Sequence, residues 1–373
     1  MASGDEFDPR PQHGVVNALP LRVLITHERF SPDFGGGGED IALQTALGLL
    51  ARGHEVHVLT AGDPAITEYR GIRTERLPIS RYALNFQVPA IVRAARRADI
   101  VHTFNYHACL PSLAAARIAG KPVVCEILAL FGDTWRSMRG PLVGRAFQAW
   151  ERFMVTRRYD RSMFLSEPSR QIALRLGAPA DSSILLAPGI DHAKLPRPDR
   201  RNRIVLFAGR MDVRKGIHHV LAAARALPDI PFCAVGWADD VDALRRAAPP
   251  NLDIVASTGS TRYLDLLSQA PIFLFPSYSE TYGMVVAEAM AAGCAVISSI
   301  DTIDFAGDFV APGDEAAMIA AVQRRWDDPV GTDLLGVENQ QRAGKFTWDH
   351  HMDRLLASYD EVIASRGQRH KAA

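Results

Sequence analysis

Cysteine is scarce in this chain of 373 residues: it has four, far apart in the sequence and mostly among apolar or small residues. This pattern excludes the dense cysteine framework of a small secreted domain. We predict reduced core cysteines of a cytosolic protein. The residues concerned are Cys109, Cys125, Cys233 and Cys294.

Long apolar runs and an excess of charge are also missing. No stretch approaches the roughly 18 apolar residues of a transmembrane helix. Residues 1–20 carry acidic charge and prolines without a secretory apolar core, so we predict an unstructured leader. Lys and Arg total 42, as do Asp and Glu, which excludes a global attraction to nucleic acid or anionic membrane. We expect a soluble, cytoplasmic protein.

Short apolar segments typical of β-strands recur along the chain, with helical patterns between them. This alternation predicts parallel sheets covered by helices on both faces, which is an α/β fold. The strand candidates are 21–28, 55–60, 99–104, 122–127, 161–166, 204–209, 231–236, 252–256, 271–276 and 295–299.

A segment rich in charge and proline, KLPRPDRRNR at 194–203, interrupts the alternation and is the best linker candidate. It divides the chain into two α/β domains, 21–196 and 203–345. The tail, 346–367, is predicted to be a helix whose apolar face requires a surface to pack on. That face consists of Met352, Leu355, Leu356, Tyr359, Val362 and Ile363.

Three segments at predicted strand ends are unusual, and ligands of open parallel sheets bind at such ends. The first holds four consecutive glycines, 35–38, before a helix. Such a loop brings backbone N–H groups close to a ligand, with the positive helix end behind them, although a flexible turn has the same composition. It is not G-x-G-x-x-G, so a nicotinamide site has little support.

The second segment is AGRMDVRKG at 208–216, directly after a predicted strand. Arg210 and Lys215 flank a tight turn there and could clamp a diphosphate, the first bidentately and the second as a point charge. Basic loop residues that merely face solvent give the same pattern, so Arg210 and Lys215 alone do not establish a diphosphate site.

The third segment is SETYGMVVAEA at 279–289. Gly283, Met284 and Val285 open a predicted helix, whose first N–H groups can face an anion. Glu280 stands before the helix, and Glu288 lies about 7 Å further along at ~1.5 Å per residue. The two carboxylates fit the two ends of a nucleotide sugar. The alternatives are a helix N-terminal charge for Glu280 and a solvated helix face for Glu288.

These motifs together resemble the retaining glycosyltransferases of family 4, which have the GT-B fold of two facing Rossmann-like domains. The resemblance rests on FSPDFGGGGE, GRMDVRKG, FPSYSETYGMVVAEAMAAGCAVI, FLSEPSRQIALRLGAP, LLAPGID and the terminal FTWDHHMDRLLASYDEVI, and it extends from about residue 21. It implies that the first domain binds the acceptor, that the second binds the nucleotide sugar, and that the terminal helix crosses back to the first domain.

The resemblance also implies roles for individual residues. Arg210 and Lys215 would clamp the donor diphosphate, Glu280 would bind the donor sugar, and Glu288 would bind the ribose. Further contacts to the donor are expected from a group of mostly glycine positions, namely Gly36, Gly37, Gly38, Gly209, Gly259, Gly283, Met284 and Val285.

The chain departs from the family pattern at two places. Leu128 stands about where relatives carry a histidine near the reactive sugar, and His107 is the alternative candidate, resembling a histidine of glycogen synthases. The segment after Ser299 is shorter than usual, which leaves the sugar preference open. Weaker candidates near the acceptor are Glu126, Asn105 and Asp133.

The predicted function is transfer of a hexosyl or N-acetylhexosaminyl group from a nucleotide sugar to a hydroxyl of a small-molecule, natural-product or glycolipid acceptor. UDP is the first choice by family frequency, and an arginine- and alanine-rich composition suggests a bacterial source. The alternatives are a catalytically silent GT-B partner protein and a sugar-nucleotide epimerase or phosphorylase. No metal or other cofactor is expected, because the lone D-x-D, Asp240 to Asp242, more simply caps a helix.

Residues 134–161 are rich in arginine and carry an apolar stripe at helical spacing. A basic amphipathic segment of this kind could contact the inner face of a membrane. The simpler interpretation, which we favour from the sequence, is a helix packed on the core with a solvated basic face. The stripe consists of Val143, Phe147, Trp150, Phe153 and Met154.

Overall fold

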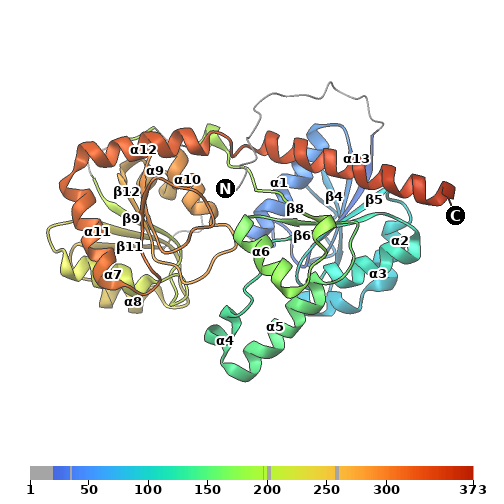
Figure 1. The fold of residues 1–373 in the computed structure, drawn as a ribbon, viewed down its shortest axis with the longest axis horizontal. Coiled ribbons are helices and arrows are strands. Elements are labelled where there is room, and N and C mark those ends of the chain that lie inside the picture. The colour runs from blue at the N-terminus through green and yellow to red at the C-terminus, as the bar shows by residue number, and fades with distance from the viewer. Residues whose placement is uncertain (1–19, 34–35, 196, 200–202, 257–259, 373) are drawn as a thin grey trace, which may run out of the picture.

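The computed structural model describes residues 20–33, 36–195, 197–199, 203–256 and 260–372 as two α/β domains joined by a linker and a long terminal helix (Figure 1). The predicted leader, 1–20, therefore lies almost wholly outside the described residues. Each domain is built on one sheet with helices on both faces, as predicted for an α/β fold.

The sheet of the first domain has eight strands in the order β3-β4-β2-β1-β5-β6-β7-β8, and all neighbours are parallel except the β3–β4 pair. Buried side chains of α2, α3, α5 and α6 share a core with one face, and α1 and α13 cover the other. Its strands are β1 Arg22–Thr26, β2 Glu55–Ala61, β3 Glu68–Tyr69, β4 Ile72–Leu77, β5 Ile100–Phe104, β6 Val123–Ile127, β7 Arg161–Phe164 and β8 Ser183–Leu185.

The second sheet has six strands in the order β11-β10-β9-β12-β13-β14, and every pair is parallel. Side chains of α7 and α11 pack on one face, and those of α9 and α10 pack on the other. Its strands are β9 Val205–Arg210, β10 Phe232–Trp237, β11 Leu252–Ala256, β12 Ile272–Phe275, β13 Ala295–Ser298 and β14 Gly307–Phe309.

The helices alternate with these strands, as a parallel sheet requires. They are α1 Gly37–Ala51, α2 Val88–Ala95, α3 Cys109–Ala119, α4 Thr134–Arg139, α5 Pro141–Val155, α6 Glu167–Leu176, α7 Ile217–Ala226, α8 Val241–Ala247, α9 Ser260–Gln269, α10 Met284–Ala291, α11 Glu315–Asp327, α12 Pro329–Ala343 and α13 Trp348–Ala372, with short 3₁₀ turns η1 Arg81–Phe86, η2 Ala180–Ser182 and η3 His192–Lys194.

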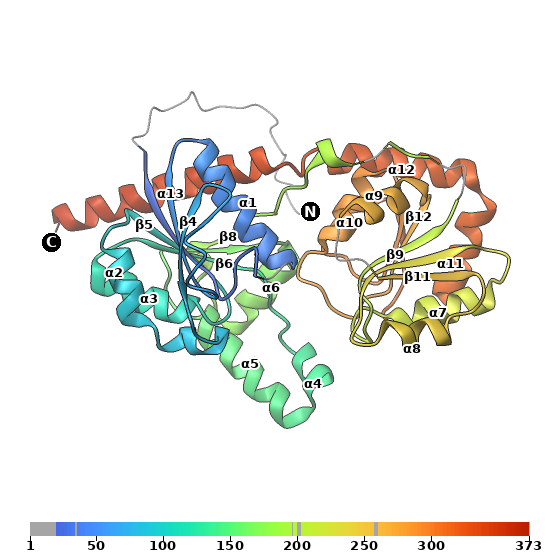
Figure 2. The same cartoon turned by 180° about the vertical axis from the view of Figure 1, so that it is seen from behind.

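Helix α13 begins at the domain junction, where the chain returns from the second domain, and runs along the first (Figure 2). It starts at Trp348 and continues to Ala372, so the predicted range of 346–367 starts slightly early and ends too soon. Tyr359 is fully buried, and its hydroxyl lies 2.6 Å from Nδ1 of His102 in β5. The predicted apolar face therefore has its partner surface, to which Met352, Leu355 and Val362 also contribute buried side chains.

The chain passes between the domains twice, at neighbouring positions. The N–H of Ile190, at the end of the first domain, donates to the carbonyl oxygen of Phe346 at 3.0 Å. Ile190 and Thr347 form a parallel β-bridge there. A Cβ at Gly189 would lie 2.2 Å from the backbone nitrogen of Trp348, so glycine permits this close approach.

All four cysteines are free and buried, which confirms their predicted place in the core. Within the described part of the chain, no helix is both long enough and apolar enough to cross a membrane.

Candidate active site

The carboxyl ends of the two sheets approach each other at the domain junction. Thr281, in the loop between β12 and α10, accepts a hydrogen bond at its hydroxyl from the N–H of Leu130 in the first domain at 3.4 Å. Its carbonyl oxygen accepts one from the hydroxyl of Ser166 at 2.5 Å. The SETYG segment is therefore held against the first domain.

Lys215 and Glu280 form an ion pair at this junction, and their side chains are only 15% and 13% exposed. The hydroxyl of Ser277 donates to Oε1 of Glu280 at 3.3 Å. Burial, with a smaller contribution from the Arg214 guanidinium, lowers the pKa of Lys215 to about 7, while Asp212 raises it. The contact with the Glu280 carboxylate also favours the charged ammonium.

Gly216, next to Lys215, allows the two loops to meet. Its φ is +75°, and a Cβ there would lie 2.1 Å from the carbonyl oxygen of Pro276. Only glycine combines this conformation with so close a backbone approach.

Arg214 is a basic residue of this cluster that is not among the site residues predicted from the sequence. Its Nη1 lies 3.6 Å from Oε1 of Glu280 and donates to the carbonyl oxygen of Ser279 at 3.1 Å. Its guanidinium also lies over the ring of Phe131, from the first domain, at 5.9 Å. The DVRKG turn could have indicated a role for Arg214, because it places two adjacent basic residues, Arg214 and Lys215, after a strand end.

Arg210, in contrast, does not join the Lys215–Glu280 pair in this structure. Its Nε lies 3.1 Å from Asp212, and its guanidinium stacks over the ring of Trp237 at 4.3 Å. It lies at the end of β9, directly after Gly209, and its side chain is 40% exposed. A long, partly exposed arginine at this edge can turn toward a diphosphate.

Glu288 lies one turn into α10, where its Oε2 accepts a hydrogen bond from the Tyr263 hydroxyl at 2.8 Å. Burial raises the pKa of Glu288 to about 7, and the bond from Tyr263 lowers it. Asp40 of α1 adds a further upward contribution across the domain junction. Tyr263 and Asp40 are residues that no sequence motif singled out.

The glycines that are predicted to contact the donor lie at the N-termini of α1 and α10. Gly36 is the N-cap of α1, and Gly37 and Gly38 lie in its first turn. Gly283 is the N-cap of α10 at φ +92°, followed by Met284 and Val285. A Cβ at Gly38 would lie 3.1 Å from Leu128, so the residue that replaces the expected histidine packs against the glycine loop. Gly259, like Gly35, lies outside the described residues.

His107 lies on the first-domain side. Its ring Nδ1 is 3.0 Å from the amide nitrogen of Asn85, and its Nε2 is 3.8 Å from Glu28. Burial lowers the pKa of His107, and the Glu28 carboxylate partly offsets this. The three weaker candidates have partners other than this histidine. Asn105 forms hydrogen bonds with the backbone of residues 128 and 129, and Glu126 is fully buried beside His102. Asp133 is exposed at the start of α4.

The D-x-D pair belongs to a helix terminus. Asp240 is the N-cap of α8, and its carboxylate accepts a hydrogen bond from the N–H of Ala243 at 2.8 Å. This confirms the predicted capping role. Over the described ranges, no three His, Cys, Asp or Glu side chains form a group that could hold a metal ion.

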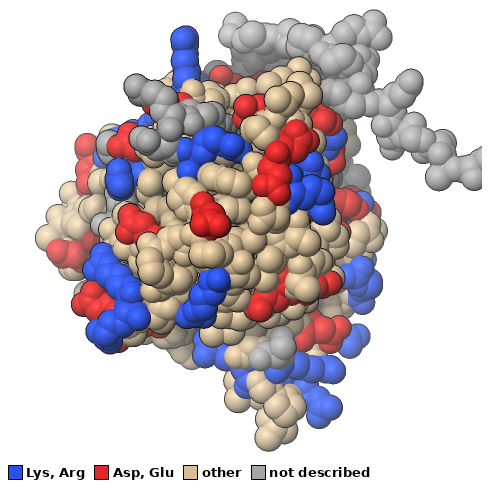
Figure 3. Space-filling model, turned by 90° about the vertical axis from the view of Figure 1, so that its left-hand side faces the viewer, with Lys and Arg blue, Asp and Glu red and all other residues tan. Residues whose placement is uncertain are grey.

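Helices α4 and α5 form a hairpin that projects from the first domain (Figure 1). The favoured prediction of a core-packed stripe is wrong for most of it: Phe153 is 48% exposed, Val143 and Phe147 are also exposed, and Met154 is buried. The projection explains the difference, since only the base of α5 reaches the core. Basic and uncharged side chains gather at this end of the molecule (Figure 3).

Comparisons with known proteins agree with this architecture. The family model described as "Glycosyl transferase 4-like domain" matches residues 36–189, and that of "Glycosyl transferases group 1" matches 202–328. The D-inositol 3-phosphate glycosyltransferase of Mycolicibacterium vanbaalenii is 27% identical, over 94% of this chain and 92% of that protein. The O-antigen chain mannosyltransferase C of Escherichia coli is 23% identical, over 93% and 100%.

Solved structures show the same fold. A sucrose-phosphate synthase from Thermosynechococcus elongatus superposes with a TM-score of 0.80 at 21% identity, covering 92% of this chain and all of that one. The Anabaena protein Alr3699/HepE, solved in complex with UDP-glucose, gives 0.76 at 17% identity, covering 91% and 100%.

The two matched domains and the paired sheets define a GT-B glycosyltransferase that acts on nucleotide sugars. The chain belongs to glycosyltransferase family 4.

Proposed function

We propose that this protein transfers a hexosyl or N-acetylhexosaminyl group from a nucleoside diphosphate sugar to an acceptor hydroxyl, with retention at the anomeric carbon and with UDP as the nucleotide. The main support is one loop-and-helix unit that carries both carboxylates, with Glu280 paired to Lys215 and Glu288 a turn into α10. The structure of Alr3699/HepE in complex with UDP-glucose supports the choice of UDP.

The proposed chemistry relies on stabilising the departing diphosphate. The bond between the sugar's anomeric carbon and the diphosphate oxygen breaks, the acceptor oxygen forms the new bond on the same face, and the hydroxyl proton passes to a diphosphate oxygen. Lys215, Arg210 and the N-termini of α1 and α10 provide positive charge where negative charge develops. We propose that neither a protein base nor a metal ion is needed.

Thermal-shift measurements with UDP, GDP, ADP and TDP and their sugar conjugates test the donor site. We expect UDP and one UDP-sugar to stabilise the protein, because a ligand at 100 times its Kd adds about 2.7 kcal/mol. The shift should disappear in Glu288→Ala. Stabilisation by another nucleotide would overturn the choice of UDP. Donor binding without any sugar transfer would instead favour the catalytically silent alternative.

The hairpin supports a second element of the proposal, a peripheral contact with an anionic membrane that would bring lipid-linked acceptors within reach. Leu142 at its tip is 79% exposed and Phe153 is 48% exposed. Arg139, Arg145 and Arg152 are exposed on the same hairpin. Exposed apolar side chains flanked by arginines suit a surface of anionic headgroups.

Vesicle sedimentation at low salt tests this contact. We expect binding to phosphatidylcholine vesicles that contain phosphatidylglycerol, with weaker binding as salt screens the charges. Leu142→Ser combined with Phe153→Ser should weaken binding at least about tenfold, since burying each side chain contributes roughly 1.5–3 kcal/mol. The exposed pair Val330 and Leu334 on α12, changed to serine in the same way, is the matched control. Equal binding by both double variants would rule out the hairpin as the contact.

A further inference from the structure

Residues 128–132, which we call the junction loop, connect the end of β6 to the start of α4 in the first domain. Each of the five consecutive backbone N–H groups of this loop donates a hydrogen bond to a side chain. Buried backbone N–H groups need such partners, and in an irregular loop the partners decide the path of the chain. The accepting side chains therefore set the conformation of the junction loop.

The first two N–H groups are held by Asn105, which follows β5 and is only 5% exposed. Its Oδ1 accepts from the N–H of Leu128 at 2.8 Å and from that of Ala129 at 3.4 Å. Its Nδ2 donates to the carbonyl oxygen of Ala129 at 2.5 Å. The amide of Asn105 is thus used to fix the first half of the junction loop.

The last two N–H groups are held by Glu151, a fully buried residue of α5. Its Oε1 accepts from the N–H of Phe131 at 3.0 Å, and its Oε2 accepts from that of Gly132 at 2.8 Å. The hydroxyl of Tyr106 also donates to Oε1, at 2.6 Å. A buried carboxylate is costly without such donors, so Glu151 and the second half of the loop hold each other in place.

The middle N–H group, that of Leu130, crosses to the second domain. It donates to the hydroxyl of Thr281, the residue next to Glu280 in the SETYG segment, at 3.4 Å. A bond of this length is close to the limit of a hydrogen bond, so a small displacement of the loop would break it. Because the N–H groups on both sides of Leu130 are fixed within the first domain, they determine where the Leu130 N–H points.

The junction loop also meets the other two segments of the candidate active site. The ring of Phe131 lies 5.9 Å from the guanidinium of Arg214 in the DVRKG turn. The side chain of Leu128 lies 3.1 Å from where a Cβ of Gly38 would stand in the glycine loop. A shift of the junction loop would therefore be transmitted to all three segments.

We propose that Glu151 is a positioning residue for sugar transfer. It holds the junction loop in the conformation that receives Thr281, and it thereby fixes Glu280 and Lys215 relative to the first domain. Glu151 itself does not touch the reacting atoms. This inference rests on the proposed function and adds to it a residue of α5 that controls the geometry of the donor site.

Glu151→Gln is the first test. Glutamine has one acceptor oxygen for three donors, and its NH2 group would face a backbone N–H, so the loop must shift. We expect kcat to fall about 10- to 100-fold, since a misplacement of about 1 Å can cost 100-fold in rate. The Kd of UDP, measured by calorimetry, should change less than about threefold, because most of the proposed donor contacts belong to the second domain. Turnover is measured with saturating substrates at a temperature where circular dichroism shows every variant folded.

A double-variant cycle separates positioning from a merely structural role. Thr281→Val removes the acceptor of the Leu130 N–H and keeps the shape of the side chain. The double variant with Glu151→Gln should be little slower than Glu151→Gln alone, because both changes act through the same contact. Losses of kcat that multiply in the double variant would overturn the proposal.

Asn339→Ala is the matched control for loss of buried hydrogen bonds. Asn339 of α12 is fully buried, and its amide accepts from the N–H of Ala306 at 2.6 Å and donates to the carbonyl oxygens of Cys294 and Ala306, both at 2.8 Å. These partners lie at the amino ends of β13 and β14, away from the donor site. The variant should have a lower Tm and an unchanged kcat. Equal losses of kcat in Asn339→Ala and Glu151→Gln would contradict the proposal, as would unchanged turnover in a folded Glu151→Gln protein.

Tyr106→Phe is a milder variant that keeps the proposal testable if Glu151→Gln does not fold. It removes one of the three donors to Glu151, so kcat should fall several-fold, again without multiplying the effect of Thr281→Val. Unchanged kcat in both Tyr106→Phe and Thr281→Val would overturn the proposal. Absence of donor binding by the wild type would instead contradict the proposed function itself.

Discussion

Replacing Lys215 with alanine should lower kcat by about 100- to 1,000-fold, the loss seen elsewhere when one preorganised oxyanion donor is removed. Lys215 is largely buried at the domain junction, in contact with Glu280 and close to the N-terminus of α10. Its ammonium is therefore poorly solvated and its charge is weakly screened, which strengthens its effect on a departing diphosphate. The measurement is steady-state turnover with saturating donor and acceptor.

Two comparisons separate this effect from misfolding. Lys215→Met keeps the apolar stem and should lose activity to a similar extent. Lys121 lies in the loop before β6, at the amino ends of the strands and so away from the proposed site. Lys121→Ala should therefore keep full activity. The folded state should survive in Lys215→Ala, because Arg214 remains 3.6 Å from the Glu280 carboxylate. Near-normal turnover in a folded Lys215→Ala protein would remove this residue from the proposed mechanism.

Glu288→Gln should weaken donor binding and, at the same time, stabilise the ligand-free protein above neutral pH. The Glu288 carboxylate is the proposed partner of the ribose hydroxyls, and a hydrogen bond to a charged group contributes roughly 1.5–3 kcal/mol. We therefore expect the donor Kd to rise about 10- to 100-fold. Isothermal titration with UDP measures this change.

The stabilisation follows from the raised pKa of Glu288. Burial moves it from 4.5 to about 7. Below pH 4.5 the carboxyl group is protonated in both the folded and the unfolded chain, so the raised pKa does not change the free energy of unfolding. As the pH rises from 4.5 through 7, the unfolded chain loses the proton more readily, and the free energy of unfolding falls. Glutamine carries no charge and avoids this loss.

Urea unfolding at pH 5 and pH 8 checks whether Glu288→Gln is more or less stable than the wild type. Glu288→Gln should exceed the wild type by about 2 kcal/mol at pH 8 and by much less at pH 5. Glu68→Gln, on the exposed edge strand β3, should show no such difference between the two pH values. A variant that is less stable than the wild type at pH 8 would show that the carboxylate is stabilising in the ligand-free protein.

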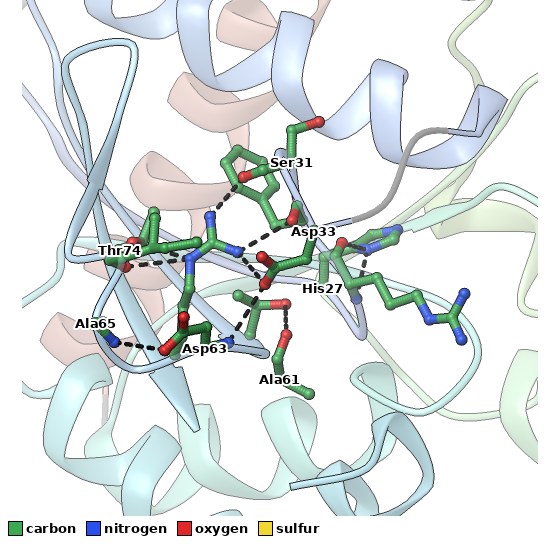
Figure 4. A network of polar contacts seen from close by, with 12 residues as sticks. His27, Ser31, Asp33, Ala61, Asp63, Ala65 and Thr74 are labelled. Carbon is green, nitrogen blue, oxygen red and sulfur yellow. Dashed lines mark hydrogen bonds and ion pairs between the residues drawn. The ribbon is translucent and has the colours of Figure 1, made fainter. Parts of the chain in front are cut away.

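Much of the fold could be predicted from periodicity, because buried parallel strands are continuous apolar runs. All ten strand candidates appear in the structure. Strand β4 is not predicted because its sequence, IRTERL, is apolar only at its two ends and has four polar or charged residues between them. Arg76 is the one buried arginine of this strand and donates five hydrogen bonds (Figure 4). Nothing in the sequence indicates these bonds.

The candidate site was partly predictable for a related reason. Glu280 and Glu288 lie in one short segment, so their spacing is compatible with a shared ligand, and the family resemblance favours that interpretation over the alternatives. Tyr263 and Asp40 meet Glu288 only through the folding of both domains, and no local pattern marks them. The exposed stripe of α5 was misjudged because periodicity shows that a helix has an apolar face, but not whether the protein covers it.

The two passages of the chain between the domains lie side by side, joined at Ile190 and Phe346. A rotation of one domain relative to the other must therefore bend both passages at the same point. Such a rotation would use the two passages as a single hinge, with its axis next to the Ile190–Thr347 bridge. The distance between the proposed donor-binding residues of the two domains would then depend mainly on one angle at this hinge.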